Sequence, residues 1–250
     1  MRKIKEQGTI CVWFSCGVAS AVAAKKTIEL YSNTHHIEIV NNPVDEEDED
    51  NIRFMKDVQD WIDFPILTQM NSDIRHTSAV KVWSDRKYMS GIKGAPCTML
   101  LKKAARYEFE RNNEIEWHVL GFTADEKQRH ERFVNTERKN LLPVLINLEL
   151  TKQDCFNIIR KAGIKIPRVY EMGYPNANCI GCVKSSSPTY WNLVRKNHPQ
   201  VFEERAKQSR EIGCRLVRVK GKRLFLDELN SEITGGKIKS YECGIFCDTN

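Results

Sequence analysis

The chain of 250 residues is predicted to be an α/β protein, with an open, mostly parallel five-stranded sheet and helices on both faces. Three observations predict this class. Short β-rich runs alternate with helical segments over the first 150 positions, which is the pattern of βαβ units. The composition, 41% hydrophobic and 29% charged, is typical of globular chains. No apolar run reaches the roughly 20 residues that span a bilayer, so we expect no membrane partner and a cytoplasmic location.

Five apolar runs are expected to be the strands of this sheet: 9–14, 37–40, 65–69, 116–122 and 141–146. Helical spacing or alanine content predicts the helices between them at 21–30, 52–62, 77–88 and 98–111. After position 150 the pattern changes: Thr151 is expected to cap a helix to about residue 162, with two further helices at 188–196 and 199–212. A short hairpin follows, its arms 215–219 and 224–229 joined at Lys220-Gly221. We therefore expect an α/β domain at 1–150 and a helical and hairpin C-terminal part at 151–250.

Charge is spread unevenly along the chain. Residues 151–250 carry 18 Lys and Arg against 10 Asp and Glu, so this part is basic. A basic part can contact the phosphates of a nucleotide or of a nucleic acid, or it can simply be a charged surface. The acidic run Asp45–Asp50 is expected to be a solvated loop that leads into the first turn of a helix, where the helix dipole favours anions.

The first sign of function is the segment Ser15–Ser20, between the first predicted strand and helix. Its Ser-x-Gly-x-x-Ser pattern offers backbone N–H groups, two hydroxyls and a helix N-terminus to an anion. Gly17 lets the backbone approach a phosphate closely. The segment has neither the Gly-Lys-Ser/Thr end of a Walker loop nor a GxGxxG pattern. The pattern therefore predicts a phosphate site. The alternative is a tight strand-to-helix turn, which requires small residues even without a ligand.

Nine cysteines are more than such a chain needs, and in a reducing compartment clustered cysteines bind metal or do chemistry. Cys11 and Cys155 stand among apolar neighbours and are expected in the core. Cys179-Ile180-Gly181-Cys182 is a CxxC pair, whose spacing lets both sulfurs reach one metal. A redox pair is the alternative. His118 is expected to pack in the core. The aromatic residues Tyr190, Trp191 and Phe202 are expected to pack helices, with stacking on a base as the alternative.

Six segments occur in one order between about residues 9 and 247: Phe14–Val22; Pro96-Cys97 with Leu101-Lys102-Lys103; Leu120–Glu126 with Arg129 and Arg132; Leu142–Leu145 with Leu150–Asp154; Tyr170–Tyr174 before the CxxC pair; and Tyr241–Gly244. Together they resemble the PAPS reductase family of the PP-loop, or adenine nucleotide alpha hydrolase, superfamily. The first of them resembles the PP-loop, with Cys16 in place of a loop glycine and Ala19 in place of the aspartate of ATP-cleaving members.

The resemblance implies roles for particular residues. An adenine nucleotide (ATP, APS or PAPS), with Mg²⁺ where ATP is cleaved, would be bound by Ser15, Gly17, Ser20, Lys102, Gly121, Asp125, Arg129 and Arg132. A [4Fe–4S] cluster, or Zn²⁺ as the alternative, would be held by Cys97, Cys179, Cys182 and Cys247. Cys243, in the Glu-Cys-Gly segment, would then be the nucleophile, unless Cys243 and Cys247 both hold the metal. A thiol reductant such as thioredoxin and a homo-oligomeric state are also expected.

Three functions follow from this resemblance. The first is reduction of an adenylyl sulfate to sulfite, with Cys243 attacking its sulfur. The second is ATP-dependent sulfur transfer to DNA or tRNA, as in related PP-loop ATP pyrophosphatases; it would use the cysteine cluster and the basic C-terminal part. The third is a non-catalytic module that binds a nucleotide or nucleic acid and carries a structural zinc.

Overall fold

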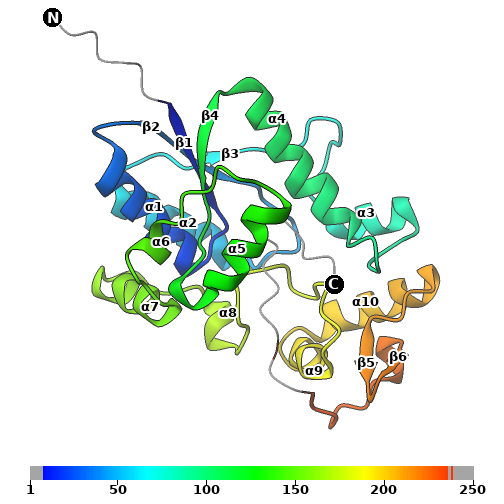
Figure 1. Cartoon of the computed structure of the whole chain (residues 1–250). Helices are drawn as coiled ribbons and strands as arrows, with labels where there is room; N and C mark the ends of the chain where they lie inside the picture. Colours follow the sequence, from blue (N-terminus) through cyan, green and yellow to red (C-terminus); the bar gives the residue numbers. More distant parts are fainter. Residues whose placement is uncertain (1–7, 236–237, 239–250) are drawn as a thin grey trace, which may run out of the picture. The chain divides into compact units, whose positions relative to one another are not determined.

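The computed structural model describes residues 8–235 and residue 238. It consists of two compact units, and Figure 1 shows their helices and strands. Among the described residues, unit 1 takes those up to Asn42, Glu49–Gln69 and Arg106–Pro167, and unit 2 takes Pro43–Asp48, Met70–Ala105 and those from Arg168 onward. The predicted domains 1–150 and 151–250 stay a prediction.

Unit 1 contains a parallel sheet of four strands in the order β3-β2-β1-β4. The strands are β1 (Thr9–Phe14), β2 (His36–Asn41), β3 (Leu67–Thr68) and β4 (Ile115–Val119). Residues 10–14 of β1 are all buried, as expected for a parallel strand with neighbours on both sides. The predicted α/β class with a parallel sheet is confirmed.

The predicted fifth strand at 141–146 is wrong in the described structure. Only Leu141 makes a bridge to β4, opposite His118, and Leu142 donates its N–H to the His118 carbonyl at 2.8 Å. Pairing ends at Pro143, because proline has no N–H to donate and its ring fixes φ. The chain then turns into the short helix α6 (Val144–Asn147).

The helices of unit 1 are α1 (Val18–Tyr31), α2 (Asp50–Ile62), α5 (Lys127–Thr136), α6 and α7 (Lys152–Lys161), together with the part of α4 (Ala104–Asn112) from Arg106 onward. Helix α1 packs against β1 and also against α6 and α7. As predicted, Thr151 caps α7: its Oγ1 accepts from the Asp154 N–H at 3.2 Å, and the Asp154 carboxylate accepts from the Thr151 N–H at 2.9 Å. Helix α5 had no counterpart among the sequence predictions, since the segment has Phe133 as its one buried residue.

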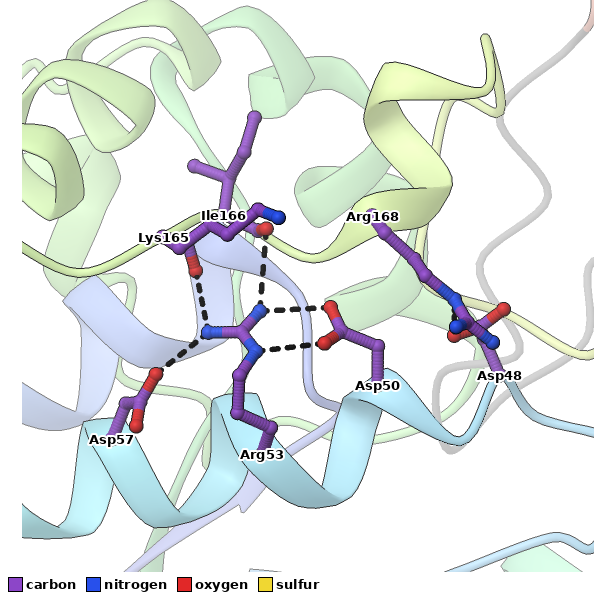
Figure 2. Close-up of polar contacts among 7 residues, drawn as sticks. All are labelled: Asp48, Asp50, Arg53, Asp57, Lys165, Ile166 and Arg168. Carbon is purple, nitrogen blue, oxygen red and sulfur yellow. Dashed lines mark hydrogen bonds and ion pairs between the residues drawn. The ribbon is translucent and has the colours of Figure 1, made fainter.

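Two charged arrangements show what becomes of the acidic run 45–50. In unit 1, Arg53 of α2 forms ion pairs with Asp50 and Asp57 at 2.7 and 2.6 Å and donates to the carbonyl oxygens of Lys165 and Ile166 (Figure 2). This guanidinium therefore ties α2 to the segment that follows α7.

In unit 2, the Asp48 side chain is buried and pairs with Arg168 at 2.8 Å (Figure 2). The Glu46 carboxylate accepts from the N–H groups of Ala79 and Val80, at 2.7 and 3.0 Å, at the first turn of α3 (Ala79–Arg86). The expectation of a solvated acidic loop is thus wrong for these side chains: partly buried carboxylates persist where a guanidinium or a helix N-terminus compensates them.

The remaining elements of unit 2 are a π-helical segment Thr98–Lys103, α8 (Arg168–Glu171), α9 (Pro188–Asn197), α10 (Pro199–Ile212) and the antiparallel pair β5 (Val217–Val219) and β6 (Lys222–Leu224). Helix α4 (Ala104–Asn112) continues from the π-helical segment. The predicted packing residues Tyr190, Trp191 and Phe202 are buried in this unit's core. None of the helices in the described part of the chain combines the length and apolar character that crossing a bilayer requires.

Candidate functional site

The candidate nucleotide site of unit 1 lies where the order of strands reverses. From β1 the chain adds β2 and β3 on one side of the sheet, and β4 then pairs with β1 on the other side. In open α/β sheets, ligands bind at the carboxyl ends of the strands at such a switch point. The loops that leave these two ends are Ser15–Gly17 after β1 and the segment from residue 120 to Thr123 after β4. Both were singled out from the sequence.

Ser20 holds the first loop closed. Its Oγ accepts from the Ser15 N–H at 3.1 Å and donates to the Gly17 carbonyl at 2.9 Å, and it lies 3.3 Å from the Ser15 Oγ. The Ser20 side chain is buried, whereas Ser15 is exposed. Ser20 therefore shapes the loop from inside, and Ser15 is the hydroxyl that remains on its outer surface.

The loop also contains a backbone conformation that L residues rarely adopt. Cys16 has φ 56°, in the left-handed region that favours glycine. Its buried side chain lies beneath Asn41 at the end of β2, whose Nδ2 donates to the Phe14 carbonyl at 2.9 Å and to the Cys16 Sγ at 3.6 Å. This geometry is one that a glycine would adopt more readily than a cysteine.

Gly121, in the segment after β4, lies against the first turn of α1. A Cβ on this residue would lie 2.9 Å from the Ser20 backbone N and 3.1 Å from the Ala19 carbonyl carbon. Real Cβ atoms essentially never approach backbone so closely, so a glycine is required here. The predicted residues Ser20 and Gly121, 101 positions apart, are thus brought together by the pairing of β1 with β4.

The N-terminus of α1 faces this loop without a side-chain cap. Gly17 is its N-cap and has no side chain, and the first turn of α1 carries no acidic residue. A helix of 14 residues carries a partial positive charge at this end. Together with the exposed Ser15 hydroxyl, this end can bind an anion such as a phosphate.

The other predicted ligands of unit 1 are less open to a nucleotide. Asp125 accepts from the Lys152 N–H at 3.0 Å, which places its carboxylate at the N-terminus of α7. Arg129 forms an ion pair with Glu126 at 2.7 Å and lies over the Phe122 ring. Arg132 is exposed on α5. Asp125 and Arg129 therefore have structural partners, and Arg132 is exposed.

Lys102 belongs to unit 2, where it is buried. Its Nζ forms an ion pair with Glu47 at 2.8 Å, and both side chains are almost fully buried. Sequence reasoning expected the ammonium to face a nucleotide and took Glu47 for a solvated residue. The π-helical segment that carries Lys102 begins directly after Cys97, and such segments are frequent at functional sites.

The CxxC pair of unit 2 is held by a tyrosine that the sequence predicted to pack helices or to stack on a base. The Tyr190 hydroxyl accepts from the Cys182 N–H at 2.7 Å and donates to the Cys179 carbonyl at 3.3 Å. Gly181, between the cysteines, has φ 71°. Burial, followed by the neighbouring Cys182, raises the pKa of Tyr190 well above its usual value, so the phenol stays protonated and keeps this bond. A buried tyrosine needs a partner for its hydroxyl, and that was the one available signal.

Cys179 and Cys182 line one small cavity of about 20 Å³, room for a single water molecule. Ser185 lines it too, and within the described part of the chain its buried Oγ has no hydrogen-bond partner. Cys97 packs in the same buried cluster as the pair. Among the described residues, no group of three or more His, Cys, Asp or Glu side chains is placed to hold a metal ion. The predicted ligands Cys97, Cys179 and Cys182 are therefore not gathered as a metal-binding group here, and the predicted fourth ligand, Cys247, lies outside the described residues, as does Cys243.

Cys11 and Cys155 are core residues, as predicted. Both are fully buried, and burial raises the pKa of the Cys155 thiol to about 12 and that of Cys11 well above its usual value. A thiol in this state is a poor nucleophile and a poor metal ligand, because both roles need the thiolate. His118 is also buried, and it accepts from the Trp13 Nε1 at 3.0 Å.

Comparison with known proteins adds no family to these observations. No family model matches the chain, and no curated protein matches it.

Proposed function

We propose that the protein binds an adenine nucleotide at the loop Ser15–Ser20 and reduces an adenylyl sulfate, APS or PAPS, to sulfite. The switch point between β1 and β4 carries this proposal, because an uncapped helix N-terminus, an exposed serine and a glycine-enforced close approach meet there. The six family-like segments supply the substrate class. Ala19, in place of an aspartate, favours a reaction that needs no cleavage of ATP.

The proposed chemistry uses the Cys243 thiolate. It attacks the sulfur of the adenylyl sulfate, a sulfur–sulfur bond forms, and the sulfur–oxygen bond to the nucleotide phosphate breaks with the phosphate as leaving group. An external dithiol such as that of thioredoxin then attacks the Cys243 sulfur, which releases sulfite and forms a mixed disulfide. The second thiol of the reductant resolves this disulfide and returns Cys243 as a thiol. A [4Fe–4S] cluster or Zn²⁺ held by Cys97, Cys179, Cys182 and Cys247 would tie together the segments that carry these cysteines.

Ile233, Gly235 and Ile238 place the described end of the chain beside α9 and the CxxC pair within unit 2. Thr189 of α9 exchanges hydrogen bonds with Gly235, at 2.7 and 3.1 Å, and Asn192 donates to the Ile233 carbonyl at 2.8 Å. Ile238 then lines the same cavity as Cys179 and Cys182. Cys243 follows five positions later, a length of chain that spans at most about 17 Å. This route supports a shared role for the tail and the CxxC thiols.

The test pairs a binding assay with an activity assay. Calorimetric titration with APS, PAPS and ATP measures nucleotide affinity for the wild type, Ser15→Ala and a control, Ser231→Ala, which removes an equally exposed hydroxyl. We expect Ser15→Ala to weaken binding about 10- to 150-fold, the loss of one hydrogen bond to a charged group, and the control to leave it unchanged. Equal nucleotide affinity in the two variants would show that the loop Ser15–Ser20 does not bind the nucleotide.

Sulfite release with thioredoxin present then tests the reaction itself. We expect Cys243→Ser to abolish release while nucleotide affinity stays at the wild-type value, because the serine hydroxyl is not ionised at neutral pH. A Cys243→Ser variant that still releases sulfite would contradict the assigned nucleophile. Nucleotide binding without any sulfite release would favour the non-catalytic module, or the second function below.

A second function, ATP-dependent sulfur transfer to DNA or tRNA, is favoured by one observation in unit 2. The β5–β6 hairpin and the residues just before it, 215–223, carry five exposed cations with no acidic residue among them. Pyrophosphate release from ATP that rises on addition of tRNA or DNA supports this function. Iron and sulfide analysis of anaerobically purified protein distinguishes [4Fe–4S] from zinc in either case.

A further inference from the structure

The hairpin β5–β6 of unit 2 is cationic beyond what its packing needs. Between Ile212 and Leu226 there are no acidic residues and five cations, all exposed: Arg215, Arg218, Lys220, Lys222 and Arg223. Val217 points into the core, so one face of the hairpin is anchored, while the opposite face carries Arg218 and Arg223. The term cationic hairpin is used below for residues 215–223.

Two local features of the cationic hairpin are expected to destabilise its folded form. Arg218 and Arg223 are directly opposite one another in the antiparallel register, and like charges in that position repel. Lys220 has φ 45° and Gly221 φ 83° in the two-residue turn, where Asn, Asp or Gly is preferred at the first position. Both departures place a cation on the solvent side. Such exceptions are expected where a surface serves a function.

Among the described residues, the partners found for the cations of this hairpin are neutral groups. Arg223 donates to the Leu216 carbonyl at 3.1 Å, and Arg215 lies 5.0 Å from the Phe225 ring centroid. No ion pair joins any of the five to a carboxylate of the described residues. By contrast Arg210, on the adjacent helix, pairs with both Asp227 and Glu228. The hairpin therefore presents uncompensated positive charge.

We propose that the cationic hairpin binds the phosphate backbone of a nucleic acid. A two-stranded antiparallel ribbon fits a nucleic-acid groove, and its cations gain affinity by releasing counterions from the phosphates. Figure 1 shows the hairpin, in orange, close to α9. The Arg218 N–H donates to the Ser186 carbonyl at 2.9 Å, four positions after Cys182, so the backbone of the hairpin is fastened to the segment of the CxxC pair.

The test is fluorescence anisotropy of the full chain with two labelled probes, a 20-base-pair DNA duplex and a structured RNA hairpin, over 50–300 mM salt. One variant replaces Arg218, Lys220, Lys222 and Arg223 by glutamine. The matched control replaces the same number of exposed lysines of unit 1 by glutamine: Lys56, Lys139, Lys161 and Lys165. The assay contains no nucleotide, so its outcome is independent of the proposed enzymatic activity.

We expect the hairpin variant to bind at least about 10-fold more weakly at 0.1 M salt, with the slope of log K against log salt lower by about 3. The control should change affinity less than about 3-fold. Equal loss with both probes supports recognition of the backbone, and preference for one identifies the class of nucleic acid. Unchanged binding by the hairpin variant, or no binding of either probe by the wild type at 50 mM salt, overturns the proposal.

A single exchange separates function from folding. Arg218→Glu turns the repulsive cross-strand pair into an attractive one, so its melting temperature should rise while its nucleic-acid affinity falls. A lower melting temperature together with lower affinity would mean that the residue acts through folding, which contradicts the proposal. Binding of the protein to anionic phosphatidylserine vesicles is measured last. If the protein binds these vesicles as tightly as the nucleic acids, and with the same dependence on the cationic hairpin, specific binding of a nucleic acid is ruled out.

Discussion

Replacing Gly121 by alanine tests the close approach of the loops after β1 and β4. The new Cβ would meet two backbone atoms, the Ser20 N at 2.9 Å and the Ala19 carbonyl carbon at 3.1 Å, which cannot rotate away as a side chain could. Forcing one methyl group into such a contact costs about 1–3 kcal/mol. Alanine also lowers the conformational entropy of the unfolded chain, which stabilises the folded state by about 0.4–1 kcal/mol. We therefore expect a net loss of about 1–2 kcal/mol.

Gly91→Ala is the matched control for this change. Its Cβ would approach the Tyr88 hydroxyl at 2.5 Å, but that atom is the far end of a side chain that can move aside. Gly91 has no positive φ, so alanine also fits its backbone. We expect the stability of this variant to stay within about 0.5 kcal/mol of the wild type or to rise slightly.

Urea unfolding followed by circular dichroism measures both free energies of unfolding, and nucleotide titration shows whether the loop is displaced. Gly121→Ala should weaken nucleotide binding as well, because the first turn of α1 must shift to admit the methyl group. Equal stability of the two variants, or a Gly121→Ala protein with full stability and full affinity, would refute the assigned close approach.

Three further changes test other parts of the structure. Ser20→Ala removes bonds of 3.1 and 2.9 Å and should cost about 1–3 kcal/mol in urea unfolding, whereas Ser15→Ala, which loses one long contact, should cost less than about 1; the reverse order would contradict the internal role of Ser20. Burial, then Arg138, lowers the pKa of His118 to about 3 from 6.5, so the folded state stays neutral while the unfolded state takes up a proton. The contribution of His118 to the free energy of unfolding should therefore be complete above pH 6.5 and fall by up to about 1.4 kcal/mol per pH unit between pH 6 and 3. His118→Gln should flatten this pH profile in thermal melts. An unchanged slope would count against a buried, neutral His118. Arg218→Glu should raise the free energy of unfolding by about 0.5 kcal/mol in the same urea assay, and a decrease would argue against the cross-strand repulsion.

Much of the secondary structure could be predicted because it depends on local pattern. The run Thr9–Phe14 is apolar and β-rich, and it forms β1 with those bounds. The cap at Thr151 follows from side chains three positions apart. The prediction failed at 141–146, where an apolar run suggested a strand, because Pro143 ends the pairing after Leu141. An apolar run of this length cannot be told from a short buried helix by periodicity alone.

The candidate site was predictable only where chain neighbours form it. The loop Ser15–Ser20 is one continuous segment, so its pattern could be read directly. The ion pair of Lys102 with Glu47 joins residues 55 positions apart, and the sequence could not show that this ammonium is already paired. The same holds for Tyr190, whose hydroxyl supports the CxxC turn from a helix eight residues beyond it.

The sequence by itself determined the α/β class and the burial of Cys11 and Cys155, because each depends on composition or on residues a few positions apart. Anion binding by the loop after β1 stays a prediction. The tertiary structure decided which charges are compensated. It buried much of the acidic run against cations and a helix N-terminus, and it left the cations of the β5–β6 hairpin without carboxylates among the described residues. A charge acts through its neighbours in space, and those are set by folding.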